Sequence, residues 1–261
     1  MNPATMSRYG LHRRKALAAA VAGTLTSLGL PRSARATSGV RVLASPEQLR
    51  PVYDYVIVGA GSAGCVLAYR LGRAGRRILI IEAGGPAKPS AVEDPPQWPT
   101  LQGGPLDWRY ATTPQRGLDG RVVPYPRGKV VGGSSAINAL AYQRGHPAAY
   151  DRWPQGWRHA DLLPYFKRAE TFSGGASAWR GGNGPLHVLS LADVLDRTPV
   201  ASAFVSAVQE RGFRMTNDIG GEVTTGVGWN QLSINGHTRD DAATAYLDTL
   251  QDAQVDLLPG A

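Results

Sequence analysis

The sequence predicts an α/β fold built on a parallel sheet. Residues 55–58 and 76–81 are short runs rich in β-branched side chains and are expected to be buried strands. Residues 62–72 between them carry apolar side chains at helical spacing. A strand, a helix and a second strand form a β-α-β unit, and such a unit requires its two strands to run parallel. The chain has 261 residues, 43% of them hydrophobic, which is enough for a sizeable core.

The remaining segments are expected to be shorter elements around this unit. The patterns predict helices at 159–170 and 199–211, a strand at 227–234, a short helix at 244–250 and a strand at 255–258. Irregular structure is expected at 86–127, which is rich in Pro and turn residues, and at the Gly-rich segment 173–185. Residues 37–52 are expected to be a linker into the fold.

Residues 1–36 have the layout of an export signal. A basic front at 12–15 precedes a weakly apolar stretch at 16–30, and Ala34-Arg35-Ala36 offers a cleavage site with a mature start at Thr37. The pair Arg13-Arg14 resembles a twin-arginine signal, although the usual aromatic residue after the pair is missing. The apolar stretch is too short and too rich in Gly, Thr and Ser for a stable membrane span.

The leader therefore predicts a periplasmic or otherwise exported protein. Two alternatives stay open: an ordinary signal peptide, or a mis-assigned start, since Met6 could also initiate the chain and leave the protein cytoplasmic.

The charge and cysteine content exclude some classes of protein. The formal net charge is +8, but six of the 28 Lys and Arg lie in residues 1–36, which hold no Asp or Glu, so the body is nearly neutral. No basic run interleaved with aromatic residues occurs in the body, so no nucleic-acid partner is expected. Cys65 is the only cysteine, which rules out an intramolecular disulfide, and it is expected to be a buried packing residue.

A glycine motif between the first strand and the helix predicts a dinucleotide site. Gly59, Gly61 and Gly64 fit G-x-G-x-x-G, and Glu82 ends the second strand. Gly59 permits the tight turn, Gly61 the close approach of a pyrophosphate, and Gly64 the packing of helix on strand. Anions favour the helix N-terminus, and a carboxylate at 82 can accept hydrogen bonds from a ribose while repelling a 2′-phosphate. The Rossmann-like motif alone leaves FAD and NAD open and argues against NADP.

Further stretches resemble a known family. Asp107–Gln115, Pro126–Asn138 and Ala141–Gly145 resemble the glucose–methanol–choline (GMC) family of FAD-dependent oxidoreductases, as do Asp161–Phe166 and Gly184–Leu186. The likeness is to choline dehydrogenase-like members and runs from about residue 53 to 261. Gly132-Gly133-Ser134-Ser135 within it supplies flexible backbone N–H groups and two hydroxyls, a second anion cradle.

The resemblance implies a flavoprotein that moves a hydride from an alcohol carbon to flavin N5, with an electron acceptor that the residues do not identify. It implies a discontinuous FAD-binding domain at 53–150 and 236–261 and the start of an α+β substrate-binding domain at 151–235. Some family members attach FAD through a histidine that matches Ile137 here, so FAD is expected to be non-covalent. The residues expected to contact the cofactor are Gly59, Gly61, Ser62, Ala63, Gly64, Glu82, Ala83, Arg127, Gly132, Gly133, Ser134, Asn138, Ala139 and Ala141.

The family's catalytic histidine and its His or Asn neighbour belong to a C-terminal half that is expected to be absent. No catalytic residue and no metal site are expected among residues 1–261. The chain's own histidines have no carboxylate at triad or metal spacing and are expected to be surface or capping residues: His12, His146, His159, His187 and His237. Asp241 stands where the family usually has a serine, which puts local cofactor contacts in doubt.

Three functions therefore stay open from the sequence. The chain is the FAD-binding part of an alcohol oxidoreductase, a catalytically inactive truncated fragment, or either an NAD-binding protein or the flavin-binding subunit of a split enzyme.

Overall fold

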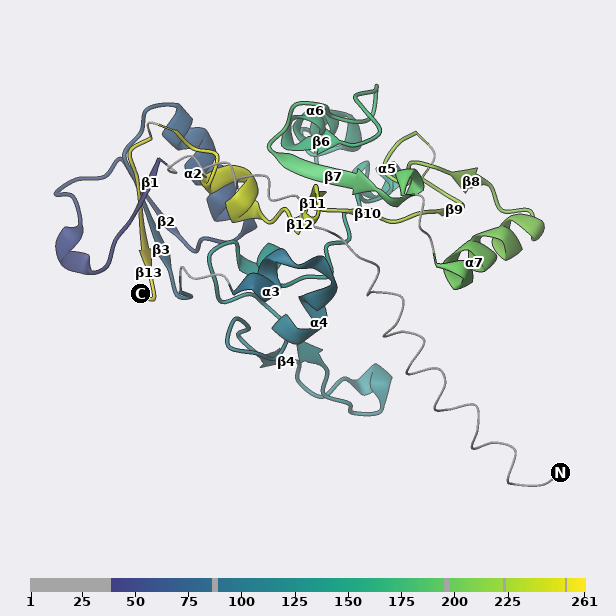
Figure 1. The fold of residues 1–261 in the computed structure, drawn as a ribbon, viewed down its shortest axis with the longest axis horizontal. Helices are drawn as coiled ribbons and strands as arrows, with labels where there is room; N and C mark the ends of the chain where they lie inside the picture. Colours follow the sequence, from purple (N-terminus) through teal and green to yellow (C-terminus); the bar gives the residue numbers. More distant parts are fainter. Residues whose placement is uncertain (1–38, 86–88, 195–197, 223, 252) are drawn as a thin grey trace, which may run out of the picture. The chain divides into compact units, whose positions relative to one another are not determined.

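The computed structural model describes residues 39–261 except 86–88, 195–197, 223 and 252 (Figure 1). Its main sheet has four strands in the order β1-β13-β3-β2, and all three pairings are parallel. The strands are β1 (Val40–Val42), β13 (Val255–Pro259), β3 (Ile78–Glu82) and β2 (Tyr55–Val58). The predicted parallel sheet is confirmed.

Helix α2 (Ser62–Arg73) connects β2 to β3 and completes the predicted β-α-β unit. Its buried face, with Cys65 and Ala68 fully buried, packs against a π-helical turn, η7 (Ala243–Leu247). The helix ends where Gly75 takes a φ of +73°, a backbone conformation that glycine adopts without steric cost. The predicted burial of Cys65 as a packing residue is confirmed.

The expectation that 37–52 is a linker is wrong for its described part, because residues 40–42 form a strand of the main sheet. β1 pairs with β13 at one edge, and Leu43 packs with Leu79 and Leu258 in a small cluster of their own. Asp256 of β13 has a fully buried side chain and accepts hydrogen bonds from Arg41, Arg50 and Tyr53. A buried carboxylate requires such partners, and all three come from the N-terminal segment.

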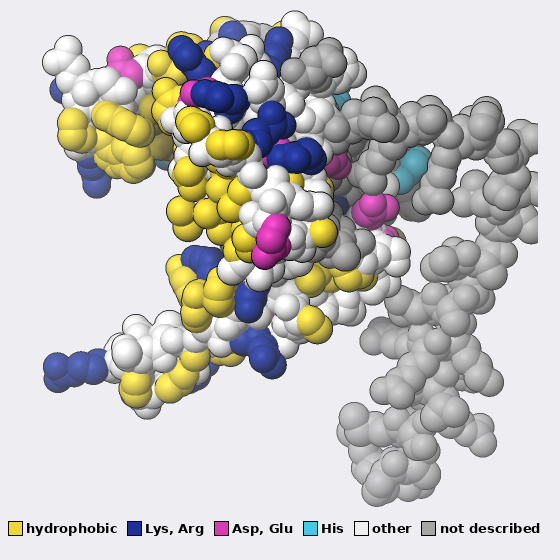
Figure 2. All heavy atoms as spheres, turned by 90° about the vertical axis from the view of Figure 1, so that its left-hand side faces the viewer, with side chains coloured by type: hydrophobic (Ala, Val, Ile, Leu, Met, Phe, Trp, Pro, Cys, Tyr) yellow, Lys and Arg dark blue, Asp and Glu magenta, His cyan; other side chains and the backbone are white. Residues whose placement is uncertain are grey.

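At the other edge of the sheet, β2 has β3 as its only partner among the described strands. Three of its four side chains are exposed although they are large and apolar: Tyr55 to 47%, Val56 to 56% and Val58 to 85%. Figure 2 faces the side where Figure 1 draws this sheet and shows hydrophobic side chains gathered at its surface. Strands of parallel sheets are normally covered on both faces, so this edge has the character of an interface.

A second sheet has the order β10-β7-β6. β6 (Glu170–Phe172) runs parallel to β7 (Leu186–Ser190), and β10 (Gln231–Leu232) runs antiparallel to it. The predicted helices are confirmed as α6 (His159–Ala169) and α7 (Pro199–Glu210), the second capped by the Thr198 hydroxyl. The short helix α5 (Pro147–Tyr150) precedes α6.

The prediction of one strand at 227–234 is wrong. The segment contains three two-residue strands, each with a different partner: β9 (Val227–Gly228) pairs with β8 (Met215–Thr216), β10 with β7, and β11 (Ile234–Asn235) with β12 (Thr238–Arg239). Apolar content suggested one continuous run, but each pairing is decided by which strand lies alongside, and that contact is non-local. The helix predicted at 244–250 is the shorter η7.

The segment 86–127 forms an arm with little regular structure, as predicted. It holds α3 (Ser90–Glu93), α4 (Trp98–Leu101) and a two-stranded hairpin of β4 (Tyr110–Ala111) and β5 (Pro124–Tyr125). Isolated 3₁₀ turns occur here and elsewhere, at 46–48, 95–97, 116–118, 133–136 and 191–193. None of the described helices combines the length and the apolarity that crossing a bilayer would need.

Candidate nucleotide-binding site

The first glycine turn, residues 59–64, has the geometry that its sequence predicts. Gly59 takes a φ of +95°, and its N–H donates to the carbonyl of Ile81 at 2.7 Å. A Cβ on Gly64 would lie 2.0 Å from the carbonyl oxygen of Gly59, so helix and strand can pack only because that atom is missing. The predicted roles of Gly59 and Gly64 in the turn are confirmed.

The N-terminus of α2 offers uncapped backbone donors. Gly61 is the N-cap residue, and no side chain accepts a hydrogen bond from the helix there. The N–H groups of Ser62, Ala63 and Gly64 have no acceptor one turn earlier within the helix. Together with the helix dipole they favour an anion at this end, and Ser62 and Ala63 are exposed to receive it.

The second glycine turn, residues 132–135, lies directly against the first. Gly132 takes a φ of +99° and its N–H donates to the carbonyl of Ala60 at 2.8 Å, while Gly133 takes a φ of +58°. A Cβ on Gly133 would lie 2.6 Å from the Cα of Gly61. The two glycine turns are therefore in contact in the structure, which the sequence alone does not predict.

The sequence predicts two serine hydroxyls for the second anion cradle, but only that of Ser134 keeps its proton for an anion. Ser135 Oγ donates its proton to the Gly132 carbonyl at 2.6 Å and accepts from the Ala242 N–H at 2.9 Å. Ser134 Oγ accepts from the Gly128 N–H at 3.1 Å, which leaves only its own proton to give. These side chains hold the turn in shape, because backbone N–H groups so close to another chain segment need local acceptors.

Glu82 lies at the carboxyl end of β3, where the sequence places it. Its carboxylate is buried and accepts from the N–H of Ala60 at 2.7 Å and from the N–H of Gly84 at 2.8 Å. It therefore ties the first glycine turn to the loop after β3, which contains the half-buried Ala83. Each carboxylate oxygen has a second lone pair with which to accept from a ligand hydroxyl.

A pocket of about 240 Å³ lies between the start of α2 and the segment that follows the second turn. We call it the turn pocket. Of the residues expected at the cofactor, the structure brings Ser62, Asn138 and Ala141 into its wall. Sequence reasoning missed the residues that complete the lining: Val66, Ser135, Tyr142, Leu186, Ser233, Asp240, Ala242 and Tyr246.

Arg239 supports the wall of this pocket from behind. It is 2% exposed, and its guanidinium donates to the carbonyls of Val92, Ser135 and Asn138 and to Asn138 Oδ1, at 2.8 to 3.0 Å. Burial lowers the pKa of Arg239 and the nearby Asp241 opposes this. No local signal in the sequence marks Arg239, because every acceptor is about a hundred or more residues away in the chain.

Asp241 caps the start of η7, a function that a serine could also perform. Its Oδ1 accepts from the N–H groups of Ala243 and Thr244, at 2.8 and 3.2 Å, at the start of η7. A Cβ on Gly132 would lie 2.7 Å from the same oxygen, so Asp241 also abuts the second turn. Its carboxylate adds negative charge beside Arg239 that a serine would not supply.

His187 has a carboxylate partner that no spacing in the sequence indicates, 53 residues away in the chain. Its ring Nδ1 lies 2.9 Å from Asp240 Oδ2, and its backbone N–H donates to the same oxygen at 2.6 Å. Burial raises the pKa of Asp240, and the two bonds from His187 oppose that rise. His146, by contrast, caps α5 as expected of a structural histidine, accepting from the Ala148 N–H.

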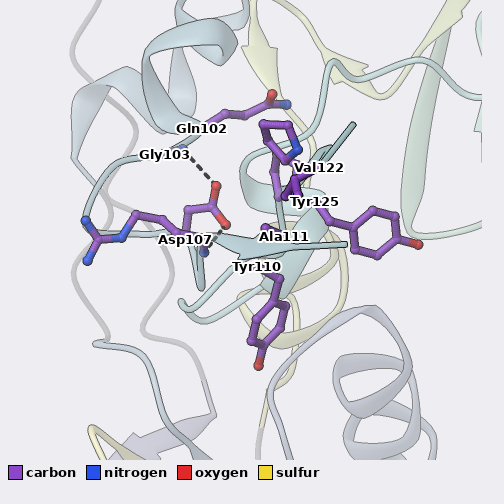
Figure 3. A pocket seen from close by; sticks show the side chains of 10 residues that line it. Gln102, Gly103, Asp107, Tyr110, Ala111, Val122 and Tyr125 are labelled. Atoms are coloured by element: carbon purple, nitrogen blue, oxygen red, sulfur yellow. Dashed lines mark hydrogen bonds between the residues drawn. The ribbon is translucent and has the colours of Figure 1, made fainter. Parts of the chain in front are cut away.

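The structure does not bring Arg127 to the turn pocket. Its guanidinium stacks 3.9 Å from the Tyr125 ring centre and donates to the Pro126 carbonyl, on the hairpin arm. The arm has its own pocket of about 450 Å³, whose lining includes Tyr110 and Tyr125 (Figure 3). Asp107 beneath it is buried and accepts from three backbone N–H groups, those of Gly103, Arg109 and Arg127. This carboxylate therefore fixes the backbone of the arm.

Within the described residues, no three His, Cys, Asp or Glu side chains lie close enough together to hold a metal ion. Ala139 is exposed beside Asn138 without lining the pocket.

Comparisons with known proteins agree with this geometry. Residues 53–261 match the GMC oxidoreductase family. Human mitochondrial choline dehydrogenase is 41% identical over 253 residues, 91% of this chain and 40% of that protein. The oxygen-dependent choline dehydrogenase of Brucella anthropi is 42% identical over 220 residues, 79% of this chain and 38% of its own length.

Solved structures show the same fold. Pyridoxine 4-oxidase from Mesorbium loti superposes with a TM-score of 0.75 at 35% identity, over 80% of this chain and 42% of that one. An FAD-dependent oxidoreductase from Chaetomium thermophilum superposes with a TM-score of 0.69 at 29% identity, over 78% and 38% respectively. The chain thus spans about two fifths of the length of these relatives. It belongs to the GMC oxidoreductase family.

Proposed function

We propose that this chain binds FAD and forms the cofactor-binding part of an oxidoreductase that acts on alcohols. The observation that carries the proposal is the contact of the two glycine turns, Gly59–Gly64 and Gly132–Ser135. A single turn is typical of any dinucleotide site. Two turns in contact, with a largely apolar pocket that also holds polar groups beside them, suit a long cofactor with a diphosphate at one place and a ring system further along.

The residues present fit FAD on three counts. Uncapped N–H groups at the start of α2 suit the diphosphate, and Gly59 and Gly61 leave open space where a Cβ would stand. Each oxygen of the Glu82 carboxylate keeps a lone pair with which to accept from the adenosine ribose, since only the N–H groups of Ala60 and Gly84 use the others. Asn138 and Ala141 in the wall of the turn pocket would line the flavin. When bound, FAD supplies a hydride acceptor, and the protein supplies orientation and electrostatics.

FAD should be held without a covalent bond. Ile137 occupies the position that a flavin-linking histidine takes in some family members. It is 2% exposed and packs among Val92, Leu101 and Val130, away from the lining of the turn pocket. An aliphatic side chain in an apolar cluster cannot bond to the flavin.

The test is to express the chain with FAD, separate it from free cofactor by gel filtration and then precipitate it with acid. A yellow supernatant over a colourless pellet is the expected result. Protein that leaves the column without flavin would refute FAD binding, and yellow colour retained in the pellet would refute the non-covalent bond. A parallel experiment with NAD in place of FAD tests the other candidate nucleotide.

The substrate of the whole protein is proposed to be a small alcohol. Relatives that share this fold are a choline dehydrogenase, a pyridoxine 4-oxidase and a formate oxidase, whose substrates differ widely. The proposal therefore goes no further than the substrate class, and the electron acceptor stays open.

We also propose that the chain works together with the part that its relatives have beyond the region it spans. The exposed apolar edge at β2 supports this, because Val56 and Val58 would be costly to leave in water. The alternative is that the chain occurs without this second part and is a catalytically inactive fragment.

Export by the twin-arginine route is proposed from Arg13 and Arg14, which lie outside the described residues. A flavoprotein is best loaded with its cofactor before it crosses a membrane, and this route carries folded proteins.

A further inference from the structure

We propose that Arg239 fixes the side-chain amide of Asn138 as a hydrogen-bond donor toward the turn pocket, so that the ligand atom meeting Asn138 is an acceptor. The inference rests on the proposed function only where it names that ligand as FAD. Arg239 is a positioning residue in this account, since it acts through Asn138 and not on the ligand itself.

The guanidinium of Arg239 cannot rotate without losing several hydrogen bonds at once. Its Nε donates to the Val92 carbonyl at 2.9 Å, and its Nη2 donates to the Asn138 carbonyl at 2.8 Å. Its Nη1 donates both to the Ser135 carbonyl at 3.0 Å and to Asn138 Oδ1 at 2.9 Å. Acceptors on three sides of a planar donor fork leave it one orientation.

The amide of Asn138 is therefore oriented by its neighbours. Oδ1 accepts from Arg239 Nη1 and, at 3.0 Å, from the N–H of Leu140. Both partners are donors that cannot act as acceptors, so a flipped amide would place its NH₂ group against two other N–H groups. The oxygen must face inward, and both lone pairs of Oδ1 are used.

The nitrogen of the same amide is left with two protons to donate. No residue in the described part of the chain accepts a hydrogen bond from Asn138 Nδ2, and Asn138 is an exposed residue in the wall of the turn pocket. A ligand there meets a donor. A carbonyl oxygen or an unprotonated ring nitrogen of a flavin satisfies it, and a ring N–H does not.

The backbone around Asn138 is held in an unusual conformation by the same contacts. Leu140 takes a φ of +61°, which residues with a Cβ rarely adopt, and its carbonyl accepts from the Ser233 N–H at 2.9 Å. Strained residues of this kind persist where surrounding contacts over-determine them, and they gather at ligand sites. The bond from the Leu140 N–H to Asn138 Oδ1 couples the strain to the amide orientation.

The substitution Asn138→Asp tests the roles of the amide oxygen and the amide nitrogen independently. The inward oxygen is kept and becomes charged, so it pairs with Arg239, while the outward NH₂ becomes an oxygen that repels an acceptor. The matched control is Asn235→Asp, which adds the same charge on the exposed β11–β12 hairpin outside the pocket. Each variant of the full chain is measured at neutral pH for its thermal midpoint without cofactor and for its dissociation constant for FAD by fluorescence titration.

We expect Asn138→Asp to keep or raise the thermal midpoint and to weaken FAD binding at least ten-fold, with Asn235→Asp unchanged in both. A dissociation constant for Asn138→Asp within two-fold of the wild type would overturn the inference about the ligand. A midpoint lowered in Asn138→Asp but not in Asn235→Asp would overturn the inward orientation of Oδ1. Wild-type chain that binds no FAD would refute the proposed function and the ligand named here, while the thermal midpoints would still decide the role of Arg239.

Discussion

Gly61 and Gly133 approach so closely that a Cβ on Gly133 would stand 2.6 Å from the Cα of Gly61. Next to this contact the N–H of Gly132 donates to the carbonyl of Ala60 at 2.8 Å. The two glycine turns thus form one continuous backbone surface, and its integrity depends on the absence of side chains at the point of contact. Gly133 therefore contributes to the site because it has no Cβ at the point of contact.

Gly133→Ala should accordingly destabilise the protein and weaken FAD binding together. The new Cβ would clash with Gly61, and alanine disfavours the φ of +58° that Gly133 takes. Overpacking of this kind typically costs about 1–3 kcal/mol of the free energy of unfolding. Urea denaturation measures the effect. Gly117→Ala is the matched control, because Gly117 has open space and an ordinary φ. Equal stability of the two variants would contradict the contact.

Glu82→Ala should weaken FAD binding at least ten-fold. Hydrogen bonds to a charged group contribute about 1.5–3 kcal/mol each, and the carboxylate is placed to accept from a ribose. Because Glu82 also accepts from Ala60 and Gly84, the thermal midpoint should fall as well. Glu82→Gln, which keeps the shape, should lie between. Glu210→Ala at the exposed end of α7 is the control. An FAD dissociation constant within two-fold of the wild type would remove Glu82 from the site.

Asp256 should make the protein sensitive to acid. Burial by itself would raise the pKa of Asp256, but hydrogen bonds from Arg41, Arg50 and Tyr53 outweigh it and hold that pKa well below its usual range. A depressed pKa means that the carboxylate stabilises the fold fully above its unfolded-state pKa of about 3.9, and that this contribution disappears as the pH falls toward the folded-state value.

Asp256→Asn should cost about 1–3 kcal/mol at neutral pH, because it removes the charged acceptor of Arg41, Arg50 and Tyr53, while the two partly exposed arginines can still be hydrated. The difference in unfolding free energy between wild type and variant should shrink as the pH drops below about 4. Chemical denaturation over a pH series checks this. A difference that stays constant with pH would mean that Asp256 does not carry the charge in the folded state.

The chain with FAD, an artificial electron acceptor and a panel of primary alcohols including choline should show no turnover above free FAD. The described residues that line the turn pocket include no histidine, and general base catalysis typically contributes about 10²–10⁴-fold. His187 is close by, but its Nδ1 is engaged by Asp240. Turnover that tracks the purified chain would show that the base lies within these residues.

Supplying the part that the relatives have beyond this region, as a second chain, should restore solubility and turnover together. The partner is expected to cover β2, so Val58→Asp on the exposed edge should reduce the gain while leaving FAD binding by the first chain intact. Val200→Asp on α7, another exposed apolar residue, is the matched control. A gain unaffected by Val58→Asp would place the interface elsewhere.

Changing Arg13 and Arg14 to Lys should stop export without altering the charge of the leader. Cell fractionation followed by N-terminal sequencing is the measurement. A mature form that still begins near Thr37 outside the cytoplasm would exclude the twin-arginine route and favour an ordinary signal peptide.

The sequence by itself determined the β-α-β unit, the turn at Gly59–Gly64 and the place of Glu82. These features are local: a strand run, a helix period and glycines at fixed spacing lie within one short segment, and backbone sterics do the rest. The same locality explains why α6, α7 and the arm at 86–127 were predictable.

Only the tertiary structure decided what depends on partners far away in the chain. Residues 40–42 form the strand β1 because β13 lies beside them. The segment 227–234 contains three short strands because its parts pair with three different strands. Asp240 contacts His187, and Arg239 donates to Asn138, in pairs that no sequence spacing predicts. A buried polar group needs a hydrogen-bond partner, but the local sequence does not identify that partner. The partner is determined when distant segments pack together.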